Sequence, residues 1–197
     1  MFSRALVLVA LVAPLAAAEQ PAGWQVEAWP AFATTGDIKG PAGGMTVLRA
    51  VSGWLALGAT IDSARLSASG ATQQITIASF PTTIGGPYSY AVVTTFAGAV
   101  AQVRLPFGRF VASADFAAGW NEVRQLYSYN TQCGYGSGFN MRLGTGLAFA
   151  AKEHLLLGVR AAVRPPAFSG YCLDMFGPWE FRFGMLTSVG PTVSVRF

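Results

Sequence analysis

The sequence predicts an all-β fold, an eight-stranded antiparallel up-and-down β-barrel that spans a membrane. Apolar side chains occupy every second position in several short segments of the chain. Charged residues make up 11% of the chain and hydrophobic residues 52%, whereas ordinary soluble domains carry about 25% charged residues. Beyond the N-terminus, no apolar run reaches the about 20 residues of a membrane helix. A transmembrane barrel accounts for these observations, because only alternate side chains of its strands contact lipid.

The C-terminal segment 181–197 shows the alternation most clearly. Its odd positions, from Phe181 to Phe197, are mostly apolar, and its even positions are small, polar or cationic, with Arg182 and Arg196 among them. Successive side chains of a strand point to opposite faces. The segment therefore has one face that suits lipid and another that suits the interior of a barrel.

Residues 1–18 are predicted to be a signal peptide. Arg4 supplies a positive start, an apolar run follows, and a row of alanines precedes Glu19 as a small-residue cleavage site. We therefore expect an exported chain in which 19–197 form a single barrel domain.

Eight segments have the alternation of membrane-spanning strands, and the second is the weakest because its apolar residues occupy both faces. They cover residues 23–34, 45–51, 54–63, 88–105, 109–120, 139–150, 155–164 and 181–197. Long loops at 35–44, 64–87, 121–138 and 165–180 alternate with short turns at 52–53, 106–108 and 151–154. In membrane barrels the short turns face the periplasm and the long loops face the exterior.

Two local features of these segments carry separate expectations. The stretch from Gln74 to Phe80 is strand-like and predicts a hairpin that projects beyond the membrane. Ten strands would require this stretch and a further partner to cross as well. The alternation of the fourth segment changes phase near Gly98, which predicts a β-bulge.

Charged side chains on the inward phases predict a network in the lumen. Arg or Lys on the lipid face at the midplane costs about 2–4 kcal/mol, so these side chains should point inward. Side chains just fill an eight-stranded barrel, and a charge there must be paired or hydrated. We expect three carboxylates and three arginines to form a balanced plug, with a gated path for water or small ions, or a binding site, as alternatives. The residues are Glu27, Asp62, Asp115, Arg142, Arg160 and Arg182.

The two cysteines fall in predicted exterior loops. Cys133 lies in the loop 121–138 and Cys172 in the loop 165–180. Because an exported chain meets an oxidising environment, a disulfide between them is expected. Two free thiols or a crosslink to a partner are the alternatives. No metal or other cofactor is expected, since the single histidine, His154, lies at the opposite end of the barrel.

Aromatic residues sort into two predicted girdles, which hold a barrel at a fixed depth in the membrane. The periplasmic girdle comprises Trp24, Trp54, Phe107, Phe110, Phe149 and Phe197, and the outer girdle comprises Phe32, Trp120, Phe139, Trp179 and Phe181.

The signal peptide, the eight amphipathic segments and the terminal run from Val193 to Phe197 together resemble the small eight-stranded outer-membrane barrels of Gram-negative bacteria. That group includes the transmembrane domain of OmpA, and OmpX. The resemblance implies an outer-membrane location among outer-membrane lipids and lipopolysaccharide. It also implies that the barrel assembly machinery recognises the C-terminal strand through Phe197.

The expected role is non-catalytic, either structural or in surface interaction, by a monomer whose exterior loops have an unknown ligand. Nucleic-acid binding is not expected, because the basic residues are scattered and the net charge is only +4. Some barrels of this kind modify lipid A with a histidine and a serine, but His154 sits in a predicted turn with no serine near it in sequence. The alternatives are a narrow channel for small solutes and an outer-leaflet lipid-modifying enzyme.

Overall fold

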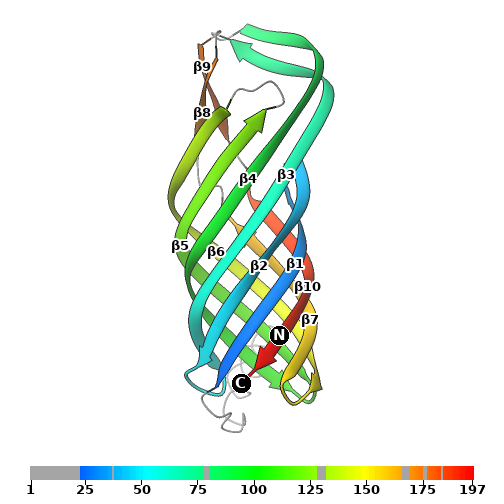
Figure 1. Ribbon diagram of the computed structural model, residues 1–197, viewed down its shortest axis with the longest axis vertical. Helices are drawn as coiled ribbons and strands as arrows, with labels where there is room; N and C mark the ends of the chain where they lie inside the picture. Colours follow the sequence, from blue (N-terminus) through cyan, green and yellow to red (C-terminus); the bar gives the residue numbers. More distant parts are fainter. Residues whose placement is uncertain are drawn as a thin grey trace, which may run out of the picture.

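The described chain forms a closed antiparallel barrel with a separate two-stranded hairpin at one end (Figure 1). The computed structural model describes residues 23–36, 38–77, 80–127, 132–165, 169–174, 177–182 and 184–197, and within them all side chains except those of 68–90, 125–135 and 169–182. The described residues include no helix long and apolar enough to cross a membrane.

Eight of the ten strands close the barrel, in the order β1–β2–β3–β4–β5–β6–β7–β10 and back to β1, while β8 pairs only with β9. Each neighbouring pair is antiparallel. The predicted all-β, eight-stranded antiparallel barrel is thus confirmed. The strands are β1 Trp24–Thr35, β2 Ile38–Ala50, β3 Leu55–Ile77, β4 Phe80–Phe107, β5 Phe110–Tyr127, β6 Gln132–Lys152, β7 Leu155–Arg164, β8 Ser169–Asp174, β9 Gly177–Arg182 and β10 Leu186–Arg196.

The two ends of the barrel differ. One end, which we call the short-turn end, carries three short connections and the last residue of the chain. The connections are β2–β3, β4–β5 and β6–β7. Two backbone hydrogen bonds join Trp24 and Phe197 there. The Trp24 N–H donates to the Phe197 carbonyl oxygen at 3.2 Å, and the Phe197 N–H donates to the Trp24 carbonyl oxygen at 2.8 Å. The opposite end, the hairpin end, carries the long β3–β4 hairpin (Figure 1).

The predicted loop between the third and fourth segments is a continuous hairpin. β3 has 23 residues and β4 has 28, and their pairing runs to Ile77 opposite Phe80 with one irregularity between Gly70 and Thr72. Residues 74–77 and Phe80 therefore belong to the far part of a projecting hairpin, and the described residues there add no further pair of barrel strands. Threonine and isoleucine, which favour strands, are frequent in it.

Two other predicted loops are also strand in part. The expected loop 35–44 is a tight connection, because β2 already begins at Ile38 and Gly36 turns the chain with a φ of +56°. Gly40 lies in the strand, where a Cβ would run into the carbonyl oxygen of Arg65. The eighth segment is predicted to begin at Phe181, but Phe181 belongs to β9 and the barrel strand β10 starts only at Leu186.

The expected bulge near Gly98 is wrong. Gly98 pairs in regular register with Thr60 on one side and Gly119 on the other. A Cβ at Gly98 would collide with the carbonyl oxygen of Ala118, so the glycine permits close approach of two backbones. The alternation changes phase in the sequence because Phe96, a large apolar residue, is fully buried inside the barrel.

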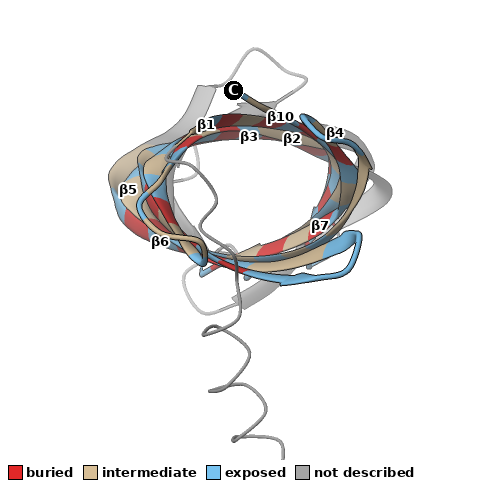
Figure 2. Cartoon of the chain, turned by 90° about the horizontal axis from the view of Figure 1, so that it is seen from below, coloured by how far each residue is buried: buried red, intermediate tan, exposed pale blue. Residues whose placement is uncertain are grey.

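The outward faces form an apolar band around the barrel. Buried and exposed residues alternate along the strands (Figure 2). In the described strands, charged side chains on the outward faces lie at two levels, Arg49 and Lys152 near the short-turn end, and Lys39, Arg65, Glu122 and Arg124 toward the hairpin end. Aromatic side chains are exposed near both edges of the band, among them Trp24, Trp54, Phe107, Phe110, Phe32, Trp120 and Phe139. Trp179 and Phe181 of the predicted outer girdle lie outside the described side chains.

Pairing of β1 with β10 closes the barrel. The register runs from Gln25 opposite Arg196 to Thr34 opposite Thr187 but is interrupted over residues 29–31. The same register brings Pro30 opposite Pro191, and neither proline has a backbone N–H to donate to the ladder. The closing seam is therefore weakest at mid-height.

Candidate functional site

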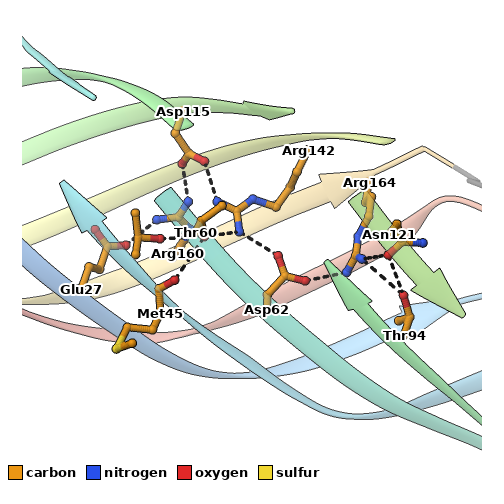
Figure 3. A network of polar contacts seen from close by, with 11 residues as sticks. Glu27, Met45, Thr60, Asp62, Thr94, Asp115, Asn121, Arg142, Arg160 and Arg164 are labelled. Atoms are coloured by element: carbon orange, nitrogen blue, oxygen red, sulfur yellow. Dashed lines mark hydrogen bonds and ion pairs between the residues drawn. The ribbon is translucent and has the colours of Figure 1, made fainter. Parts of the chain in front are cut away.

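Six charged side chains form a continuous chain of ion pairs across the barrel interior (Figure 3). We call this set the lumen network. It consists of Glu27 on β1, Asp62 on β3, Asp115 on β5, Arg142 on β6, and Arg160 and Arg164 on β7. Acids and bases alternate, so that the three negative and three positive charges balance.

The contacts run from β1 through the lumen to the far end of β7. Arg160 donates to a carboxylate oxygen of Glu27 and to Oδ2 of Asp115 at 2.6 Å. Arg142 donates to Oδ1 of Asp115 at 3.1 Å and to Oδ2 of Asp62 at 2.8 Å. Arg164 donates to Oδ1 of Asp62 at 2.6 Å. Each aspartate therefore binds two guanidinium groups.

The network is buried, with at most 10% of any of its six side chains exposed. A buried ion pair repays the cost of leaving water only if its geometry is good and its remaining donors are bound. Neutral residues supply part of this support. The hydroxyl of Thr60 accepts from Arg142 at 3.2 Å, and Asn121 accepts from Arg164 and from Thr94.

Two aromatic rings pack against the arginines inside the barrel. The guanidinium of Arg160 lies 4.5 Å from the ring centre of Trp29, and that of Arg142 lies 5.2 Å from it. Arg164 lies 5.4 Å from the ring centre of Phe96. These rings fill space and attract the cations through their negative faces, which fixes the arginines in position.

Two clusters of apolar side chains pack in the lumen beside the network. One cluster lies toward the hairpin end and comprises Ala33, Ile38, Ala64, Leu66, Val92 and Val123. The other comprises Leu48, Ala56, Phe96, Val100 and Ala117. Two cavities touch the network, each of about 20 Å³, which is room for about one water molecule. The free space in these two cavities is therefore small.

Comparisons with known proteins identify the fold. No family model and no curated protein sequence matches the chain. A major outer membrane protein from Thermus thermophilus matches with a TM-score of 0.58 and 14% identity over 90% of this chain and 100% of that chain. OprG from Pseudomonas aeruginosa matches with a TM-score of 0.56 and 7% identity, over 89% of this chain and 97% of that chain. Neisserial surface protein A matches with a TM-score of 0.52 and 13% identity, over 91% of this chain and 99% of that chain. The chain has the fold of the small eight-stranded outer-membrane β-barrels.

The barrel brings together five of the six charged residues that are predicted to point inward. The sixth, Arg182, lies in β9 rather than in a barrel strand, and its side chain is outside the described residues. Arg164 supplies the third arginine instead. It shares the inward phase of Arg160, four residues earlier on β7, and that phase is the signal for it in the sequence.

Sequence reasoning misses Asn121 and Arg104. Asn121 falls in a predicted loop, but β5 continues to Tyr127 and keeps Asn121 in the lumen, 2% exposed. Arg104 lies on the fourth segment, whose phase is ambiguous near Gly98. It is buried in the lumen near the short-turn end, 7% exposed.

The other predicted site residues lie apart from the network. Phe197 ends the chain beside Trp24 and is 73% exposed. Cys133 lies at the start of β6 and Cys172 in β8, so both occupy strands rather than the predicted loops, and their side chains are outside the described residues. In the described part of the chain, no group of three or more His, Cys, Asp or Glu could hold a metal ion.

Proposed function

We propose that the protein is a non-catalytic integral protein of a Gram-negative outer membrane, a closed barrel that presents its β3–β4 hairpin for surface interaction. Outer-membrane lipids and lipopolysaccharide surround it, and Phe197 serves as the signal for the assembly machinery. The observation that carries the proposal is the lumen network, which crosses the interior from β1 to β7 without a gap in its ion pairs.

The closed lumen favours a scaffold over a channel. Passage of an ion through the middle of the barrel requires separation of buried pairs such as Asp115 with Arg142, whose side chains are 1% and 2% exposed. Removal of one partner from a buried pair costs about 3–5 kcal/mol. The cavities beside the network hold about one water each, too little for a hydrated path.

The hairpin supports a role in surface interaction. β3 and β4 rise beyond the rest of the barrel (Figure 1), and no charged residue occurs between Arg65 and Arg104. The stretch is rich in Ser, Thr and Gly with two tyrosines near its end, Tyr88 and Tyr90. Such a composition suits adaptable hydrogen bonding with another surface.

Planar-bilayer recording tests the closed lumen. The purified barrel is expected to insert without a steady conductance, because the ion pairs leave no continuous water path. A steady conductance in the unmodified protein that shifts on Asp115→Ala would establish the narrow channel instead. Arg109→Ala is the matched control, since Arg109 lies in the β4–β5 turn with its guanidinium 4.9 Å from the ring centre of Phe149, away from the lumen network.

We also propose a disulfide between Cys133 and Cys172. β8, which contains Cys172, lies beside β6, which begins one residue before Cys133. The unboiled protein is expected to change its electrophoretic mobility on addition of a thiol, because the crosslink restrains the hairpin end. Cys133→Ser and Cys172→Ser should each abolish that change. A mobility that thiol leaves unaltered in the unmodified protein would show that the cysteines are not joined.

A further inference from the structure

A second layer of arginines, the buried Arg104 and the half-buried Arg196, lies between the lumen network and the short-turn end. Arg104 on β4 donates from Nε to Oε1 of Gln102 at 2.8 Å. Arg196 on β10 donates from Nε to Oε1 of Gln25 at 3.3 Å. Both glutamines are buried, at 2% and 4% exposure. The neutral amides orient the guanidinium groups but bring no negative charge of their own.

This layer differs from the lumen network in its charge balance. Among the described residues, neither Arg104 nor Arg196 has a carboxylate within the 4.0 Å of an ion pair. Arg104 is 7% exposed, and its Nη2 is buried without a hydrogen-bond partner. In Arg142, Arg160 and Arg164 the buried nitrogen without a hydrogen-bond partner is Nε. Each of these three arginines forms an ion pair with at least one carboxylate. A buried cation without a counter-ion is costly, so an anion from outside the chain would complete the layer.

A cavity at the short-turn end gives such an anion access. It has a volume of about 310 Å³, and its lining residues include Gln25, Arg104, His154, Arg196, Trp24 and Phe197. Small-molecule sites span about 300–1,000 Å³. Glu153, in the β6–β7 turn, also lines this cavity. Arg104 and Arg196 also line the smaller cavity that reaches Glu27 and Arg160, so both arginines border both cavities.

We propose that this cavity binds a phosphate group between Arg104 and Arg196. Guanidinium groups present planar forks of N–H donors that match the oxygens of a phosphate. With the Nε atoms held by Gln25 and Gln102, the terminal nitrogens remain for the ligand. Two positive charges match a phosphate that carries two negative charges. The phosphate is either free in solution or the monoester headgroup of a phosphatidic acid, because both can carry two negative charges on terminal oxygens.

Calorimetric titration of the folded protein in detergent micelles tests the site, with inorganic phosphate and with short-chain phosphatidic acid as separate probes. Arg104→Gln and Arg196→Gln should each weaken binding by about tenfold to a hundredfold, the contribution of a charge-assisted hydrogen bond. Arg49→Gln is the matched control. It removes the same charge at the same end, but from the outer face, where Arg49 lies 5.9 Å from the ring centre of Trp24. Binding in this control should be unchanged.

The calorimetric results distinguish the two sources of phosphate and test the proposal. Tighter binding of phosphatidic acid, with the same dependence on Arg104, assigns the site to a lipid headgroup, and binding of inorganic phosphate alone assigns it to a free anion. Absence of binding by both probes overturns the proposal, and so does an equal loss in Arg49→Gln. If Arg104→Gln fails to fold, Arg104→Lys retains the charge but loses the fork, and this variant should still bind phosphate more weakly than the unmodified protein.

Discussion

Replacement of Asp115 by alanine should lower the free energy of unfolding by about 3–5 kcal/mol, the cost of breaking a buried ion pair. Asp115 binds both Arg142 and Arg160, and its side chain is 1% exposed. Its loss leaves the lumen network with one uncompensated positive charge in a medium of low polarity. Urea titration of the barrel in lipid vesicles, followed by tryptophan fluorescence, measures the effect. Ser113→Ala, two residues earlier on the same face of β5, should change stability little.

The order of the ion pairs predicts different stabilities for two double variants. Removal of Asp115 together with Arg142 leaves two complete pairs, Glu27 with Arg160 and Asp62 with Arg164. Stability should therefore recover part of the loss seen in Asp115→Ala. Removal of Asp115 together with Arg160 leaves Glu27 unpaired and should bring no recovery. Additive losses in both double variants would contradict the alternating chain of charges.

Replacement of Val159 by lysine should destabilise the barrel by about 2–4 kcal/mol, because a charge is placed on the lipid face near the midplane. Val159 lies halfway along β7, between Leu147 and Pro191, and is 58% exposed. The same urea titration in vesicles measures the loss. The expectation follows from the uncharged band on the outward faces of the described strands.

The control for Val159→Lys is the same substitution at another depth. Val195 also faces outward but lies next to the short-turn end, two residues before the exposed Phe197. Val195→Lys should cost only about 0–1 kcal/mol, because lysine near the interface reaches water. Equal losses at both positions would show that the outward face is not embedded at the inferred depth.

The alternation of apolar and polar side chains predicts strand bounds well where it continues without interruption. β7 has its predicted bounds, Leu155 to Arg164, because apolar and small or cationic residues alternate throughout it. The prediction fails for 35–44 and 121–138, where glycine, proline and polar residues signal loops. Much of both stretches is strand, because pairing with an already aligned neighbour extends strands that have no apolar face of their own.

The chemistry of the lumen is predictable in part for a physical reason. Charged residues that share the inward phase must lie inside, so Glu27, Asp62, Asp115, Arg142 and Arg160 can be selected from the sequence. Which acid meets which base is not predictable, since Arg160 and Glu27 are 133 residues apart. The buried Arg104 is also missed, because Phe96 and Val100 obscure the phase of β4.

The sequence by itself determined that the chain forms a barrel wall with an apolar outside and a polar inside, because a period of two is a local property of each strand. Only the closed tertiary structure decided that Arg164 completes the ion-pair chain and that Arg104 and Arg196 line one cavity, where neither forms an ion pair with a described carboxylate. Both facts depend on the stagger between strands, which sets the height of every inward side chain across the lumen.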